Sequence, residues 1–196
     1  MLEFTLASSN SHKAQEFSEL FSSEILVIKA ASIKVEVIED GTSFQENAYK
    51  KAFAYNKKLK KPTMADDSGL VIPARADILG IHSARYAPEF SDYKDKNNKL
   101  LEDIKDLSDD DRKAYFACYL CFYLSENEVY FFEGRVHGKI AKQPSGLGGF
   151  GYDPIFLPDG QGGKTLSELN DWKMKNSHRA KACYAAQNFF QGLRRN

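Results

Sequence analysis

The chain has 196 residues, 42% hydrophobic and 28% charged, and its 27 basic and 27 acidic residues give a net charge of zero. A chain of this length buries about 70% of its unfolded surface, so it can fold without a disulfide or a structural metal. The balanced charge argues against nucleic acid or an acidic membrane as a partner, because both favour basic excess. We therefore expect a soluble globular protein of one domain, in which any bound anion is held by local groups.

The three cysteines do not predict a disulfide framework. Cys118 and Cys121 form a C-x-x-C pair, which is typical of redox sites and of half a zinc site. They lie, however, in an apolar run over residues 115–124 that we interpret as a buried strand. Strand residues an odd number apart point to opposite faces, so we favour core packing for both thiols. The chain also starts directly in a strand-like segment without a basic or long apolar leader, which predicts a cytoplasmic protein.

A strand, a polar turn and a helix are predicted first. Residues 2–7 are typical of a short buried strand, and the cluster Ser8-Ser9-Asn10-Ser11 favours a helix N-cap. Apolar residues then recur at helical spacing over 14–21. Backbone N–H groups at such a helix start can bind a phosphate. Lys13 lies in the first turn, where a cation opposes the helix dipole unless an anion lies nearby.

A stronger helix pattern follows residues 27–37, which we interpret as one or two strands. Ser43-x-x-Glu46 is a capping box. Behind it an apolar stripe runs from Phe44 to Leu59 in steps of four, four, three and four residues. Pro62 should stop this helix.

The rest of the chain interleaves strands and helices. We predict a short strand over 70–72, a loop over 79–87, a helix over 92–106, a hairpin of strands 114–124 and 129–136, a short helix capped by Thr165-x-x-Glu168, and a last helix opened by Ser177 with Cys183, Ala186, Phe190 and Leu193 on its core face. Interleaved strands and helices predict the α/β class, and the hairpin adds an antiparallel part.

Acidic residues at two turns are candidates for a Mg²⁺ site. Asp66-Asp67-Ser68-Gly69 follows a strand-like segment, and Glu39 lies at a separate turn. Adjacent residues in an extended chain point opposite ways, so only one Asp should face the site while the other holds backbone. Mg²⁺ takes one or two carboxylates and completes its shell with water and substrate phosphate. A plain turn is the alternative interpretation of the Asp pair.

Cations and an aromatic loop complete a candidate nucleotide site. A triphosphate needs several cations, and four lie beside helix starts or polar turns: Lys13, Lys51, Lys173 and Arg179. Each alone is more typical of a surface charge. The glycine-flanked Phe150 suits stacking on a flat ring, with local packing as the alternative. His178 beside Arg179 at a helix start suits a base edge or a phosphate.

Six segments, taken in order, resemble the inosine triphosphate pyrophosphatase family, whose members are Ham1-like or RdgB-like. They are residues 6–13, 39–48, 65–70, 83–87, 148–156 and 177–180. The resemblance implies an α/β fold over residues 1–196, with an elongated mixed sheet and flanking helices that form two lobes around a nucleotide cleft, and a homodimer. It also implies Mg²⁺-dependent hydrolysis of ITP, dITP and XTP to the monophosphate and pyrophosphate, which removes deaminated purines from the nucleotide pool.

The resemblance further assigns roles to single residues. It places Ser8, Ser9, Asn10, Ser11, His12 and Lys13 around the phosphates, with Lys51 as a second cation and Ser68 against the substrate. Glu39 and Asp67 would hold Mg²⁺, and Asp67 would also accept the proton of the attacking water. Phe150, Gly151, Tyr152 and Asp153 would stack on and bracket the base. Lys173, His178 and Arg179 would contact its 6-oxo edge and nearby groups.

These roles agree with elementary chemistry. Choosing a 6-oxo purine over adenine needs hydrogen-bond donors, which His178 and Arg179 supply, because donors left unpaired disfavour the 6-amino group. The chain departs from the family where Ser8-Ser9 replace Thr-Gly and where Trp172 replaces an acidic residue. These departures bear on substrate ranking more than on reaction type.

Three other functions fit the sequence less well. A Maf-type pyrophosphatase begins with a similar Leu-Ala-Ser segment, but residues 150–153 and 177–179 argue against it. A non-catalytic nucleotide sensor would use the same pocket, yet it has no need of Lys13, Glu39 and Asp67 together. A nucleic-acid-binding module is weakest, since no basic stripe with interleaved aromatics is visible.

Overall fold

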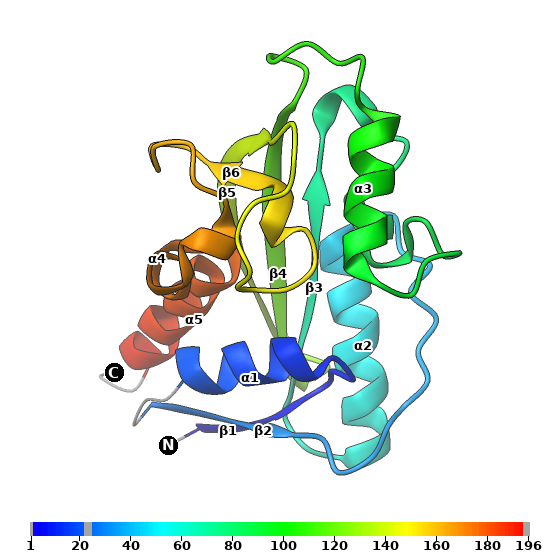
Figure 1. The fold of residues 1–196 in the computed structure, drawn as a ribbon. Helices are drawn as coiled ribbons and strands as arrows, with labels where there is room; N and C mark the ends of the chain where they lie inside the picture. Colours follow the sequence, from blue (N-terminus) through cyan, green and yellow to red (C-terminus); the bar gives the residue numbers. More distant parts are fainter. Residues whose placement is uncertain (1, 22–24, 194–196) are drawn as a thin grey trace. The chain divides into compact units, whose positions relative to one another are not determined.

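The computed structural model describes residues 2–21 and 25–193 (Figure 1). Strands and α-helices alternate as far as residue 125, after which two further strands and then two α-helices follow. The strands are β1 Leu2–Leu6, β2 Leu26–Ala30, β3 Thr63–Val71, β4 Lys113–Ser125, β5 Glu128–Ile140 and β6 Phe156–Pro158. The α-helices are α1 Ser11–Leu20, α2 Phe44–Leu59, α3 Tyr93–Asp103, α4 Asn170–Asn176 and α5 His178–Leu193. The α/β class is confirmed; Met1, on which the leader argument depends, lies outside the described residues.

The strands form one mixed sheet in the order β2-β1-β3-β4-β5-β6. β1 pairs in parallel with β2, with Leu2 opposite Leu26, and in parallel with β3, with Leu6 opposite Met64. β5 pairs antiparallel with β6. β4 and β5 are neighbours joined by two residues, which is the predicted hairpin.

The chain divides into two compact units, neither of which is a continuous stretch. Unit 1 comprises Met1–Ser68, Cys118–Gly134 and His178–Asn196, and unit 2 comprises Gly69–Ala117 and Arg135–Ser177. Strands β3, β4 and β5 each supply residues to both units.

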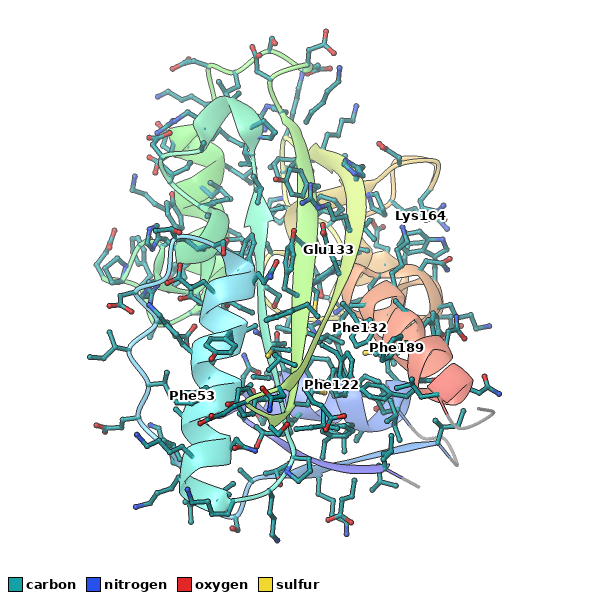
Figure 2. All side chains as sticks on the ribbon, turned by 180° about the vertical axis from the view of Figure 1, so that it is seen from behind. Phe53, Phe122, Phe132, Glu133, Lys164 and Phe189 are labelled. Carbon is teal, nitrogen blue, oxygen red and sulfur yellow. The ribbon has the colours of Figure 1, made fainter. Side chains whose placement is uncertain are left out.

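The two sheet faces of unit 1 carry separate apolar clusters. One cluster joins even-numbered β4 residues such as Phe122 to α1 and α5, through side chains that include Phe17 and Phe190. Figure 2 shows Phe122 near Phe132 and Phe189 on this face, with the Phe122 and Phe132 ring centroids 5.6 Å apart. The other cluster joins odd-numbered β4 residues to α2. Successive strand residues therefore serve opposite faces, as the β pleat requires.

This alternation separates the C-x-x-C pair. Cys118 belongs to the α1 and α5 cluster and Cys121 to the α2 cluster, and both are fully buried. Burial raises the pKa of both thiols to about 12, so they are neutral at physiological pH. The prediction of core packing is confirmed.

Unit 2 has its own apolar core. Leu100 and Ile104 from α3 and its C-cap pack with Phe116 and Phe156, whose rings meet edge to face at 4.9 Å. The buried Arg112 donates to the carbonyl oxygen of Ile104, the C-cap of α3, and to that of Ala141, which follows β5.

Three predicted elements differ from the structure. Of the predicted segment 27–37, only residues 27–30 lie in a strand, β2; further on, the Val35 N–H donates to the Tyr55 hydroxyl instead of to a strand. The segment 66–69 is no turn but the middle of β3, which ends at Val71 and so includes residues 70–71 of the separately predicted strand 70–72. Residues 80–85 of the expected loop form a 3₁₀ helix, held by hydrogen bonds between the Ser83 hydroxyl and Leu70.

The helix ends follow the sequence signals more closely. The Ser43 hydroxyl caps α2 by accepting from the Glu46 N–H, but the Glu46 carboxylate accepts from Thr42 rather than Ser43, so the capping box is half formed. The Thr165 capping box is complete. The last helix begins at His178, and Leu193 is 50% exposed because it lies in the final turn, beyond the packed stripe.

Candidate active site

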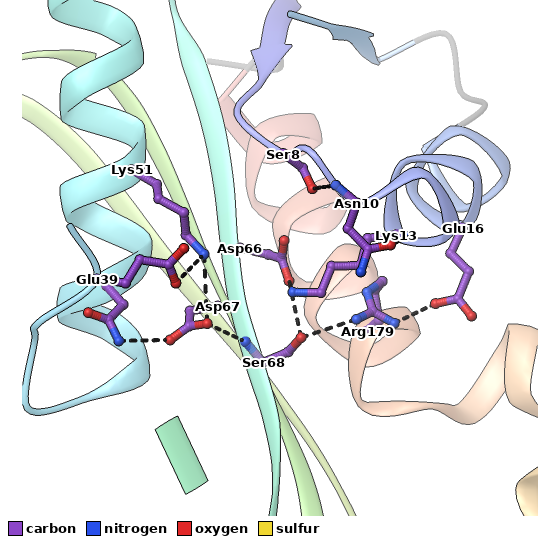
Figure 3. Close-up of polar contacts among 11 residues, drawn as sticks. Ser8, Asn10, Lys13, Glu16, Glu39, Lys51, Asp66, Asp67, Ser68 and Arg179 are labelled. Carbon is purple, nitrogen blue, oxygen red and sulfur yellow. Dashed lines mark hydrogen bonds and ion pairs between the residues drawn. The ribbon is translucent and has the colours of Figure 1, made fainter. Parts of the chain in front are cut away.

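The polar turn after β1 caps α1 as predicted. Asn10 is the N-cap, and its side-chain oxygen accepts from the Lys13 N–H at 3.1 Å. The Ser8 hydroxyl oxygen in turn accepts from the Asn10 N–H at 3.2 Å (Figure 3). Ser8 is half-buried, while Ser9, Asn10, Ser11 and His12 are exposed. The turn is thus ordered by its own side chains and faces solvent.

Asp66 points to the sheet face that α1 and α5 cover. It is 1% exposed, and its Oδ2 lies 2.7 Å from Lys13 Nζ and accepts from the Ser68 hydroxyl at 3.2 Å (Figure 3). Burial alone would raise the pKa of this carboxyl, but Lys13, Lys51 and Arg179 outweigh it and hold the pKa well below its usual value. Asp66 is therefore ionised. The expectation that the second Asp would hold backbone is wrong for Asp66, because its buried charge is balanced by a lysine.

Asp67 points to the opposite face, toward α2. Its Oδ2 accepts from the Asn47 amide at 3.1 Å, and its Oδ1 lies 3.7 Å from Lys51 Nζ and accepts from the Ser68 N–H. Burial raises the pKa of this carboxyl, and the nearby lysines do not fully offset the effect. Two adjacent carboxylates of one strand thus lie in different surroundings.

Lys51 joins Asp67 to Glu39. Its Nζ lies 3.1 Å from Glu39 Oε2 as well as 3.7 Å from Asp67 Oδ1 (Figure 3). Burial lowers the pKa of Lys51, but Asp66, Asp67 and Glu39 together raise it above its usual value. Two carboxylates and one ammonium leave a formal charge of −1 here.

This donor set fits a hard divalent cation. No group of three or more His, Cys, Asp or Glu side chains that could hold a metal occurs among residues 2–21 and 25–193. Mg²⁺ needs fewer protein ligands, because it keeps several waters and binds through one or two carboxylates plus substrate phosphate. Glu39 and Asp67 are such a pair, and the local negative charge favours a cation.

Arg179 lies with the Asp66 group. It is 2% exposed, its Nη2 donates to Ser68 Oγ at 3.2 Å, and its Nη1 forms an ion pair with Glu16 (Figure 3). Its guanidinium also lies 5.5 Å from the ring centroid of Phe17. His178, the preceding residue, is buried as well.

The sequence interpretation missed two residues of this site, Glu16 and Asn47. Glu16 follows Lys13 by three positions and Asn47 precedes Lys51 by four, so each shares a helix face with a proposed cation. This helical spacing could have identified both residues as neighbours of the proposed cations.

In unit 2 a buried ion pair shapes the loop around Phe150. Lys173 Nζ lies 2.8 Å from Asp153 Oδ2, and both side chains are at most 5% exposed. The same oxygen accepts from the Phe150 N–H at 2.9 Å, and the Lys173 ammonium lies 4.6 Å from the Phe150 ring centroid. Gly149 has φ +74°, and an added Cβ would lie 2.2 Å from Asp153 Oδ2, so only glycine fits.

The neighbouring residues hold this loop in place. Tyr152 is 4% exposed, donates its hydroxyl to the Ser83 carbonyl at 2.6 Å, and meets the Tyr93 ring edge to face. The Gly151 carbonyl accepts from the Asn97 amide at 3.1 Å. Tyr152 is therefore a core residue that anchors the loop, while Phe150 stays half-exposed.

The structure thus brings the proposed residues together in three groups. One face of unit 1 gathers Lys13, Ser68 and Arg179 with Asp66 and Glu16; the other gathers Glu39, Lys51 and Asp67 with Asn47; and unit 2 gathers Phe150, Gly151, Tyr152, Asp153 and Lys173. The individual roles remain predictions.

Lysines meet carboxylates on both faces of β3 in this α/β protein, and fixed cations of this kind can stabilise phosphate oxygens. The model of the Ham1 family matches residues 4–189, and the chain belongs to that family. The resemblance inferred from the six segments is confirmed.

Relatives and solved structures agree. The dITP/XTP pyrophosphatase of Clostridium perfringens is 39% identical over 204 residues, which cover 98% of this chain and 99% of that protein. The dITP/XTP pyrophosphatase of Geobacillus kaustophilus is 41% identical over 189 residues, covering 93% and 91%. The Staphylococcus aureus Ham1 protein superposes with a TM-score of 0.86 at 36% identity, covering 97% of this chain and 99% of that one. A Coxiella burnetii HAM1 protein gives 0.86 at 34% identity, covering 98% and 100%.

Membrane insertion through a helix has no support in the described ranges. None of the helices within residues 2–21 and 25–193 has the length and apolar character needed to cross a bilayer.

Proposed function

We propose that this chain is a nucleoside triphosphate pyrophosphatase that hydrolyses dITP, XTP and ITP to the monophosphate and pyrophosphate. The observation that carries the proposal is a set of three cations in unit 1, the buried Arg179 and the half-buried Lys13 and Lys51, arranged around Asp66-Asp67-Ser68. The relatives' name, dITP/XTP pyrophosphatase, supports the reaction and two of the three substrates, dITP and XTP. Such an enzyme would keep deaminated purines out of nucleic acid.

The cations suit cleavage between the α- and β-phosphates. This cleavage leaves negative charge on the departing pyrophosphate, and charges fixed in a partly buried site stabilise it better than charges in water. The Lys13 and Lys51 side chains are 17% and 13% exposed, and each is held by a carboxylate. They would receive the phosphates without first having to be ordered.

Glu39 and Asp67 would hold Mg²⁺, and when bound it would offset charge on the phosphate oxygens. Asp67 would also accept the proton of the attacking water. Its burial supports this role, since a carboxylate in a less polar environment is a stronger base. Asn47 and the Ser68 N–H would keep it oriented.

The loop of unit 2 would hold the base. The Lys173 ammonium lies over one face of the Phe150 ring, so a purine would stack on the other face. Gly151, Tyr152 and Asp153 would fix the loop around it, and Lys173 and His178 would lie near the 6-oxo edge. Arg179, which lies beside Ser68, would contact neighbouring groups of the nucleotide. We further propose a homodimer located in the cytoplasm.

A panel of triphosphates tests the substrate class. With Mg²⁺ present, we expect kcat/KM for dITP, XTP and ITP to exceed that for ATP by roughly 100-fold or more, because donors facing a 6-amino group are left unpaired. GTP shares the 6-oxo group, so a lower kcat/KM for GTP must come from contacts at the 2-position, and TTP, a pyrimidine, should also be a poor substrate. Chelation of Mg²⁺ should abolish turnover. Equal rates for all six nucleotides would refute the selectivity. Tight binding of the first three without any product would indicate a nucleotide sensor.

A further inference from the structure

The proposed hydrolysis gives Asp66 no role as a metal ligand, a proton acceptor or a substrate contact. It lies on the face of the sheet opposite to Asp67, is 1% exposed, and is paired with Lys13, so it is not placed to share a metal or a water with Asp67. Burying an ionised carboxylate costs free energy unless nearby cations and hydrogen-bond donors compensate its charge. The contacts of Asp66 identify these groups.

A single oxygen of Asp66 organises two cations. Oδ2 lies 2.7 Å from Lys13 Nζ and also accepts the proton of the Ser68 hydroxyl at 3.2 Å. A hydroxyl has one proton to donate, so with that proton on Asp66 its lone pairs are free to accept. The Ser68 oxygen accepts from Arg179 Nη2, also at 3.2 Å. Arg179 therefore donates to the Ser68 hydroxyl, the Ser68 hydroxyl donates to Asp66, and Lys13 donates to the same Asp66 oxygen.

Lys13 depends on this carboxylate more than Arg179 does. Arg179 has a second anchor in its ion pair with Glu16 and rests on Phe17. For Lys13, by contrast, Asp66 is the sole carboxylate partner within the described part of the chain. A lysine is a point charge on a flexible stem, so without that partner its ammonium would sample many positions.

We infer that Asp66 is a positioning residue, whose carboxylate fixes the Lys13 ammonium directly and the Arg179 guanidinium through the Ser68 hydroxyl. The inference rests on the proposed function in one respect, namely that Lys13 receives phosphate. Asp66 itself touches neither substrate nor metal. The adjacent aspartates thus divide their tasks between the two faces of β3.

The test is a double-mutant cycle with Asp66→Asn, Lys13→Met and both together. Calorimetry measures the Kd of inorganic pyrophosphate, and steady-state assays measure kcat and KM for dITP. Removing a negative charge should tighten pyrophosphate binding if only net charge mattered. We expect the opposite for Asp66→Asn, about tenfold weaker binding and about a tenfold lower kcat. In the Lys13→Met background the same change should cost about twofold at most, because Arg179 keeps its ion pair with Glu16.

The control is Glu3→Gln, which breaks an exposed ion pair with Lys29 in the same unit and should change neither quantity. Tighter pyrophosphate binding by Asp66→Asn, or losses that add in the double variant, would overturn the inference. If Asp66→Asn does not fold, Asp66→Ser takes its place in the cycle, and tighter pyrophosphate binding or additive losses would again overturn the inference. If wild type releases no product from dITP, the proposed function fails, while the pyrophosphate cycle still decides the role of Asp66.

Discussion

Asp67→Asn is expected to lower kcat for dITP by roughly 10³-fold or more, because the variant loses both the proton acceptor and one of two proposed metal ligands. The fold should persist. Asparagine is nearly the same size, and its carbonyl can still accept from the Ser68 N–H or the Asn47 amide. Steady-state kinetics with dITP and thermal unfolding measure the two effects separately.

The matched control is Asp40→Asn. Asp40 neighbours Glu39 and pairs with Lys50, but its side chain is 68% exposed, so the same change of charge should alter kcat less than twofold. An Asp67→Asn enzyme that keeps at least a third of wild-type kcat would refute the assigned role of Asp67.

Gly134→Ala is expected to lower the free energy of unfolding by about 3 kcal/mol, the upper part of the range for overpacked cores. Gly134 in β5 lies against the first turn of α5, and an added Cβ would lie 2.0 Å from the His178 carbonyl oxygen and 2.6 Å from the Ala182 nitrogen. Both obstacles are backbone atoms, so the helix start itself must move. Since that turn carries Arg179, kcat/KM for dITP should fall as well.

Gly192→Ala, in α5 itself, is the matched control. No heavy atom lies within 4 Å of the added Cβ, so this change should be neutral or stabilise by about 0.5 kcal/mol. Urea unfolding of both variants gives the comparison. Equal stability of Gly134→Ala and wild type would show that α5 is not seated on β5 as described.

The sequence predicted the elements whose ends are marked by local signals such as a helix cap, a proline or a short gap between strands. Both bounds of α2 follow from the Ser43 cap, the apolar stripe and Pro62, and the β4–β5 hairpin follows from two strand-like runs with a two-residue gap. The continuous β3 was missed because Asp66 and Asp67 look like turn residues. They are tolerated inside a strand only because Lys13 and Lys51 meet them from opposite faces. Those partners lie far away in the sequence.

The site, like the fold, was predicted only in part. Its residue types and segments could be read from the chain, and the structure gathers Glu39, Lys51 and Asp67 as proposed. The grouping of Arg179 with Glu16 and Ser68 was not predictable, because it depends on how α1 and α5 pack on the sheet. The different surroundings of Asp66 and Asp67 could not be predicted either, because they depend on which helix covers each face of β3.

The most direct test of the central claim is the identity of the products formed from dITP or XTP with Mg²⁺. Anion-exchange separation resolves the monophosphate from the diphosphate, and an assay for pyrophosphate excludes orthophosphate. We expect equal amounts of nucleoside monophosphate and pyrophosphate, which requires cleavage between the α- and β-phosphates. Nucleoside diphosphate with orthophosphate would contradict this, because the cations would then serve a different phosphate bond.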